Sequence, residues 1–202
     1  MPSEHSTLPG RAASARSEAT ENLRIIREVM ERSGSFTAVP GWGMVTVGLL
    51  AVPASIAAVL QSDADLTLTI WLGLAAVAMV IGVYTLRRKM HRLGVTLRSG
   101  PGRKYVLSLL PSIVAGFVLT AALWLEGATD VLPTLWLLLY GAGTITGGAS
   151  SVPAIPMLGM CFMALGVLTL LAPAAWAPYA LAAGFGGLHI GFGLYIARRH
   201  DG

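Results

Sequence analysis

Long uncharged stretches of apolar residues alternate with short polar stretches through most of this chain. A helix needs roughly 20 apolar residues to cross the hydrocarbon core of a bilayer. Six stretches approach that length without a single Asp, Glu, Lys or Arg, and a tight uncharged turn at 147–153 separates the fourth from the fifth. The pattern predicts an all-α, polytopic membrane protein with transmembrane helices at 40–60, 67–86, 105–125, 131–146, 156–172 and 178–197.

Charge segregates along this six-span pattern. All 14 basic residues lie before the first predicted span, between the second and third, or after the sixth. The loops on the opposite face carry only Asp63, Asp65, Glu126 and Asp130. Because basic residues concentrate on the cytoplasmic side of membrane proteins, we expect both termini in the cytoplasm. A model with five or seven spans would break this segregation.

Residues 1–39 differ from the rest and are predicted to form a cytoplasmic tail ahead of a transmembrane domain at 40–202. Within the tail, apolar residues recur at helical spacing over 18–33, while charges of both signs occupy the other face. An N-terminal amphipathic helix is therefore expected there. Such a helix can lie along the inner membrane surface, or dock on a partner or on the chain's own loops.

Only 12% of the residues are charged, against about 25% in soluble domains. The single cysteine excludes an intramolecular disulfide. The net charge of +4 does not indicate nucleic-acid binding, because the basic residues follow the topology. The stretch between spans two and three holds seven of them and no acid, which predicts a lipid-facing loop attracted to anionic headgroups: Arg87, Arg88, Lys89, Arg92, Arg98, Arg103 and Lys104.

Several segments resemble one another. The segment 34–40, which enters span one, resembles 147–153, which enters span five, and the end of span two resembles the end of span six. The openings of spans two and four share the pattern Thr-x-Trp-Leu, at 69–72 and 134–137. One interpretation is three related helical hairpins, as in transporters built from repeats. The other is convergence, because membrane composition alone produces such likenesses.

His189 is the one ionisable side chain inside a predicted span apart from Cys161 and tyrosines. It is either a ligand-, metal- or proton-binding group facing a cavity, or a neutral histidine hydrogen-bonded across helices to a hydroxyl or a carbonyl. Tyr140 and Thr144 repeat at i+4 in span four, and with His189 they form a predicted ligand or transport path. Charged residues at membrane depth usually mark ion-coupled carriers, so their absence from the spans argues against that class.

Span five offers sulfur ligands for Cu(I) in Met157, Met160 and Cys161. Methionine is also an ordinary filler of apolar gaps, so a metal site is disfavoured and no cofactor is expected. A serine hydrolase is disfavoured by distance, because Ser150 and Ser151 lie at the inner surface, whereas His189 lies about nine residues, roughly 13 Å, up span six from that surface. The chain is therefore expected to be non-enzymatic.

Residues 30–43, together with 189–193, resemble multi-pass bacterial inner-membrane proteins without an assigned activity. The resemblance implies a bacterial inner-membrane location and no particular chemistry. The leading hypothesis is a membrane scaffold or a sensory or regulatory partner, whose basic cytoplasmic face contacts a cytoplasmic protein or a second copy of the chain. The alternative is a carrier or channel for a small neutral or weakly basic solute with its site near His189.

Overall fold

The computed structural model describes residues 18, 20–26, 37–94 and 100–199, and the chain divides into two units, Met1–Gly34 and Ser35–Gly202. In the first unit, residues 20–26 are helical, and an ion pair of 3.0 Å joins Arg24 to Glu21. The apolar side chains of this helix are exposed. The remainder of the amphipathic helix predicted over 18–33 lies outside the described residues.

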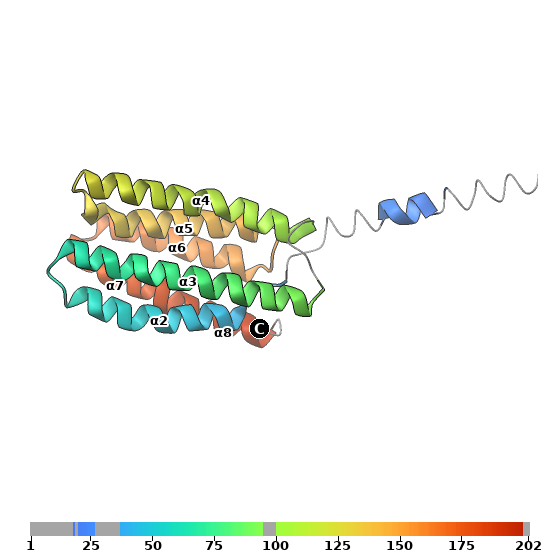
Figure 1. Cartoon of the computed structure of the whole chain (residues 1–202), viewed down its shortest axis with the longest axis horizontal. Coiled ribbons are helices and arrows are strands. Elements are labelled where there is room, and N and C mark those ends of the chain that lie inside the picture. The colour runs from blue at the N-terminus through green and yellow to red at the C-terminus, as the bar shows by residue number, and fades with distance from the viewer. Residues whose placement is uncertain (1–17, 19, 27–36, 95–99, 200–202) are drawn as a thin grey trace, which may run out of the picture. The chain divides into compact units, whose positions relative to one another are not determined.

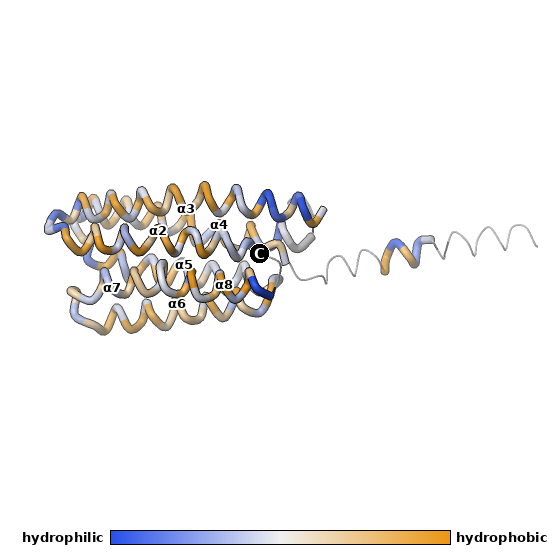
Figure 2. The backbone as a smooth tube through the Cα atoms, turned by 90° about the horizontal axis from the view of Figure 1, so that it is seen from below, coloured by the Kyte–Doolittle hydropathy of each residue, from blue (hydrophilic) through white to orange (hydrophobic). Residues whose placement is uncertain are grey.

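Six helices of the second unit are long and apolar enough to cross a membrane, which confirms the predicted all-α, polytopic architecture. Apolar residues fill the middle of the bundle, and hydrophilic ones gather at its ends (Figure 2). The first five spans are single helices (Figure 1): α2 (Gly41–Val59), α3 (Ala64–Arg92), α4 (Gly100–Leu125), α5 (Leu132–Gly148) and α6 (Ala154–Leu171). The sixth span combines an α-helical turn, a π-helical segment and a final α-helix: α7 (Ala177–Leu181), η3 (Ala182–Leu188) and α8 (His189–Arg199).

The six spans form an open ring in the order α3, α2, the sixth span, α6, α5 and α4. The two ends of this ring are α3 and α4, which are consecutive in sequence. Helix α3 packs mainly on α2, and α4 packs mainly on α5. Only 6% of the residues in the apolar windows of α3 and α4 are buried, against 33–39% in the other four spans. The ring is therefore open on the side between α3 and α4.

Glycines set the two tightest seams of the ring. A Cβ at Gly193 of α8 would lie 2.9 Å from the carbonyl oxygen of Gly41 in α2, and a Cβ at Gly159 of α6 would lie 2.7 Å from that of Gly141 in α5. Small residues allow backbones to approach this closely. Not every glycine of the sixth span serves this purpose, because Gly191 faces open space.

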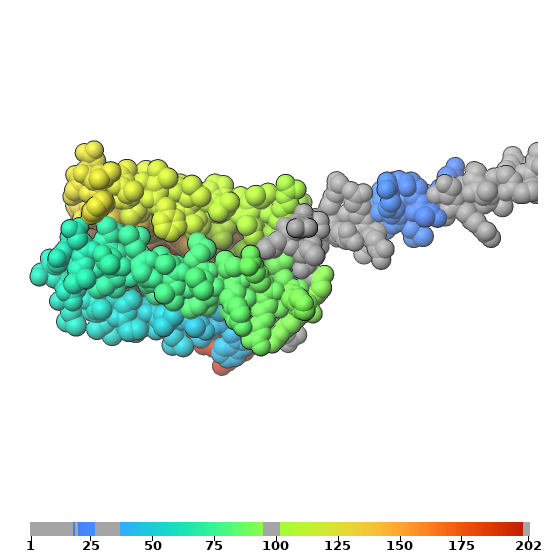
Figure 3. Space-filling view, in the orientation of Figure 1, coloured from blue at the N-terminus to red at the C-terminus, as the bar shows by residue number. Residues whose placement is uncertain are grey.

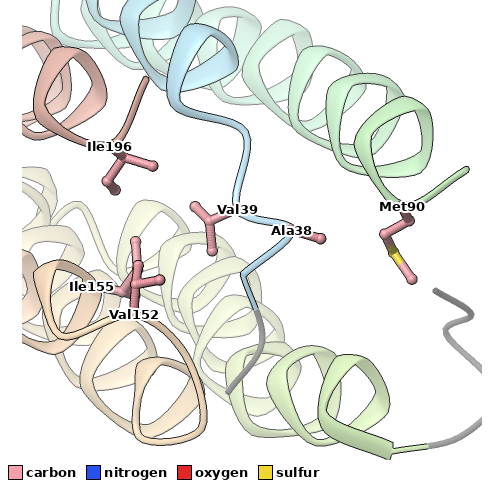
Figure 4. Close-up of a cluster of buried hydrophobic side chains, with 6 residues drawn as sticks. All are labelled: Ala38, Val39, Met90, Val152, Ile155 and Ile196. Atoms are coloured by element: carbon pink, nitrogen blue, oxygen red, sulfur yellow. The ribbon is translucent and has the colours of Figure 1, made fainter. Parts of the chain in front are cut away.

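The extended segment 37–40 enters the bundle at the end where α3 and α8 finish. Its side chains Ala38 and Val39 are buried in a cluster with residues of α3, of α8 and of the α5–α6 connection and the start of α6 (Figure 4): Met90, Ile196, Val152 and Ile155. Lys89 Nζ donates a hydrogen bond of 3.0 Å to the carbonyl oxygen of Val39. The described part of the segment 34–40, residues 37–40, therefore meets the similar segment 147–153 here, and their origin as a repeat stays a hypothesis.

Candidate functional site

A cavity of about 430 Å³ occupies the centre of the open ring, and all six spans contribute to its wall. Figure 3 shows the surface hollowed between α3 and α4, so the cavity forms a lateral groove on that side. At the far end from segment 37–40, Trp124 Nε1 of α4 donates a hydrogen bond of 2.9 Å to Asp65 Oδ1 of α3. This bond ties the two walls of the groove together at that end.

The groove is long. Along α3 it extends from Trp71 to Leu86, which corresponds to about 22 Å of helix axis. Its volume of about 430 Å³ lies within the range of pockets that hold small molecules. The groove is therefore large enough to hold a small molecule.

Two hydrogen bonds define the tautomer of His189, which is only 4% exposed and borders the groove. Its Nδ1 lies 3.4 Å from the carbonyl oxygen of Gly184, and its Nε2 lies 2.8 Å from the hydroxyl of Tyr140. A carbonyl oxygen only accepts, so Nδ1 carries the hydrogen. Nε2 of the neutral ring is then the acceptor, and the Tyr140 hydroxyl donates to it.

Thr144 completes a row of polar groups that we call the polar floor (His189, Tyr140 and Thr144). Elsewhere in the spans, threonines such as Thr85 and Thr169 donate back to the carbonyl oxygen four residues earlier. The Thr144 side chain instead interacts with that of Tyr140. The structure thus brings together the three residues predicted to line a path, and their role in transport stays a prediction.

Aromatic rings hold the polar floor in place. The rings of Tyr140, Phe162, Phe185 and His189 contact one another with centroid distances between 4.8 and 6.0 Å. Trp71 of α3 extends the cluster, with its centroid 6.2 Å from that of Phe185. Tilted and edge-to-face pairs of this kind add stability beyond the area they bury.

The π-helical segment η3 ends immediately before His189. A π-helical turn is wider than an α-helical turn and is frequently found at functional sites. Here it includes Gly184, whose carbonyl accepts from His189, and Phe185, which joins the aromatic cluster. The wide turn thus shapes both the polar and the aromatic side of the floor.

Sequence reasoning missed two tryptophans of the groove. Trp71 and Trp136 both line it, and Trp136 Nε1 donates a hydrogen bond of 2.8 Å to Thr120 Oγ1 of α4. The shared Thr-x-Trp-Leu openings of spans two and four contain these same tryptophans. That likeness was the available signal for this part of the site.

The predicted sulfur ligands do not reach the groove. The side chains of Met157 and Met160 are 55% and 54% exposed, and Cys161 is half-buried. None of the three lines the groove, and the described residues contain no group of three or more His, Cys, Asp or Glu suited to a metal ion.

The predicted lipid-facing basic loop is largely helical. Four of its residues lie on α3, which continues to Arg92 rather than ending near Leu86, and two lie on α4. Lys89 is buried with 8% exposure and bonds to Val39, so its placement in a lipid-facing loop was wrong. Arg98 lies outside the described residues, and the others are exposed: Arg87, Arg88, Arg92, Arg103 and Lys104.

These features define a class: an integral, multi-pass membrane protein with six spans and a lateral groove that has a polar floor. Comparisons with models of protein families, with curated proteins and with solved structures found no match for the chain.

Proposed function

We propose that the protein binds a small, lipid-soluble molecule that enters the groove sideways from the bilayer, and that it acts as a non-enzymatic carrier or sensor for this molecule. The observation that carries the proposal is the polar floor at the base of a largely apolar groove. Polar side chains at membrane depth cost free energy and commonly mark sites of function. The proposal develops the predicted carrier with a site near His189.

Closure of both ends of the groove supports sideways entry. Ala38 and Val39 occupy one end, and the bond from Trp124 to Asp65 joins the walls at the other. A molecule dissolved in the hydrocarbon reaches the opening between α3 and α4 without passing either end. Since a site of a few hundred Å³ lined by apolar and aromatic groups is typical of ligand pockets, the groove suits such a molecule.

Filling the groove from both walls should abolish binding without unfolding the protein. Gly82 of α3 and Gly116 of α4 line the groove; a Cβ at Gly82 meets nothing within 4 Å, and one at Gly116 meets only Leu139 at 3.9 Å. In Gly82→Leu/Gly116→Leu, the new side chains narrow the groove, while leucine raises helix propensity at each site by several tenths of a kcal/mol. We expect a lipid-soluble molecule to copurify with the native protein, and its amount to fall at least about tenfold in this double variant.

The measurement is solvent extraction of the purified protein followed by mass spectrometry. Gly73→Leu is the matched control, because Gly73 is also on α3 and also faces open space, yet does not line the groove. This control should retain the molecule. Equal amounts of the same molecule in the double variant and the control would contradict the proposal.

The proposal also places the chain in a bacterial inner membrane with both termini in the cytoplasm. Exposed basic side chains at the connected ends of α3 and α4 support this orientation. They would also attract anionic lipid headgroups.

A second role is that of a scaffold or regulatory partner acting through this face. It is supported by the apolar side chains of the N-terminal helix, Leu23, Ile25 and Ile26, which are 48–67% exposed.

One set of single-cysteine variants tests orientation and partner together, in a Cys161→Ser background. A membrane-impermeant maleimide should label Ser62→Cys in intact cells, and Leu23→Cys only after the membrane is opened. Labelling of Leu23→Cys in intact cells would mean that the orientation is the reverse of the one proposed.

The same variants test the partner. A bifunctional cross-linker should capture a cytoplasmic protein or a second copy from Leu23→Cys but not from Glu21→Cys on the charged face. Equal capture from both positions would mean that the apolar face is not the contact surface.

A further inference from the structure

The indole N–H of Trp71 is an unused hydrogen-bond donor at the wall of the groove. Trp71 is only 5% exposed and lines the groove from α3. The indoles of Trp124 and Trp136 each donate to an oxygen, whereas that of Trp71 has no partner among the described residues. Within the same residues, every fully buried side-chain nitrogen or oxygen is paired. The Trp71 N–H therefore borders accessible space, and the groove is the space that Trp71 lines.

An unpaired N–H is costly at this depth. Trp71 lies about 10 Å along the helix axis from the start of α3 at Ala64, below the level of the polar Asp63 and Asp65. Hydrocarbon offers no acceptor. A buried donor without a partner therefore gives up its hydrogen bonds to water and gains none in return, which costs free energy. Since indole N–H can only donate, an acceptor atom in the groove would satisfy it.

The aromatic rings beside the polar floor can hold the same ligand from the other side. Phe185 connects Trp71 to the floor, with ring centroids 6.2 Å from Trp71 and 5.4 Å from Tyr140. The Tyr140 hydroxyl gives its one hydrogen to His189, so Thr144 donates its own hydrogen to the Tyr140 oxygen. Both hydrogens are thereby used within the floor, while the rings of Trp71, Phe185 and Tyr140 offer flat apolar surfaces to a ring or a chain.

From this arrangement we infer that the ligand of the groove is a lipid-soluble carbonyl compound, such as an aromatic ketone or a quinone. Its oxygen accepts a hydrogen bond from Trp71 Nε1, and its apolar body occupies the groove. This inference rests on the proposed function, because it names the chemical class of the molecule that the groove binds. A plain hydrocarbon chain fills the same space but leaves the indole N–H unpaired.

The test compares two probes that differ only in whether they carry a carbonyl group. Benzophenone carries a carbonyl where diphenylmethane carries a CH₂, and benzophenone also inserts covalently into nearby C–H bonds on illumination. With the protein in lipid nanodiscs, benzophenone should raise the unfolding temperature at about tenfold lower membrane concentration than diphenylmethane, as one hydrogen bond predicts. Its photoproducts should map to the walls of the groove.

Trp71→Phe keeps an aromatic ring and removes the donor, so the two probes should become equivalent in this variant. Trp42→Phe is the matched control, because Trp42 is 57% exposed and does not line the groove, and it should keep the tenfold preference. Equal potency of the two probes on the native protein would overturn the carbonyl inference and leave groove binding intact. If neither probe raises the unfolding temperature and benzophenone labels no residue of the groove, the proposed function is overturned as well. Because the native protein alone decides between these results, the test stands even if Trp71→Phe does not fold.

Discussion

Gly159→Ala is expected to destabilise the bundle by about 3 kcal/mol, at the upper end of the range for overpacked interiors. A Cβ at this position would lie 2.7 Å from the carbonyl oxygen of Gly141 and 2.8 Å from the backbone nitrogen of Ile145. Both are backbone atoms of α5, so no side chain can rotate away to make room. Helices α5 and α6 would therefore have to move apart at this contact.

Gly191→Ala is the control for this effect. Gly191 lies on α8 and meets nothing within 4 Å, so a methyl group there causes no clash. Removing a glycine from the helix should stabilise it by up to about 1 kcal/mol. The two alanine variants should therefore differ by about 4 kcal/mol in the free energy of unfolding. Reversible unfolding in mixed micelles, followed by circular dichroism, measures this difference; equal stabilities would show that the α5–α6 seam is not as tight as described.

The spans were predictable from the sequence, and the order of the ring was not. Apolar length and charge segregation depend on local composition, and each predicted span matches a helix of the structure. Which helices become neighbours depends on the shapes of their surfaces. The close contacts at Gly41 and Gly159, and the open space at Gly191, look alike in sequence because all three are glycines in apolar helices.

The polar floor was predictable by residue type, while its geometry was not. His189 was predictable because it is a titratable group within a predicted span, and Tyr140 because of its helical spacing from Thr144. The hydrogen bond between His189 and Tyr140 joins residues 49 positions apart in the sequence, and the π-helical segment before His189 changes the direction in which that side chain points. Glycine-rich composition alone does not distinguish a π-helical turn from close helix packing.

Lys89 is the residue of the basic stretch whose position the charge pattern did not predict. Its neighbours Arg87 and Arg88 are exposed, as the positive charge of this stretch predicted. One residue further along α3, the long aliphatic stem of Lys89 is buried while its ammonium group donates to a carbonyl oxygen. That oxygen belongs to Val39, 50 residues away in the sequence, so the contact was not predictable from the charge pattern.

His189→Ala should also destabilise the protein by about 3 kcal/mol, within the range for removing a large buried side chain. The change removes the hydrogen bond from Tyr140, the bond to Gly184 and ring contacts with Phe162 and Phe185. Tyr140→Phe removes only the hydroxyl, and it leaves Nε2 of His189 without its donor. Since hydrogen bonds between membrane helices contribute about 0.6 to 2 kcal/mol, this smaller change should cost about 1 kcal/mol.

The double variant His189→Ala/Tyr140→Phe separates the hydrogen bond from the packing. If the Tyr140 hydroxyl donates to His189, the effects of the two single changes should not add, and the difference should be about 1 kcal/mol. Tyr179→Phe is the control, because Tyr179 is 62% exposed and should show no coupling with His189. Additive effects at His189 and Tyr140 would mean that their side chains do not interact in the membrane. The groove would then lack the fixed polar floor on which the proposed binding of a lipid-soluble molecule depends.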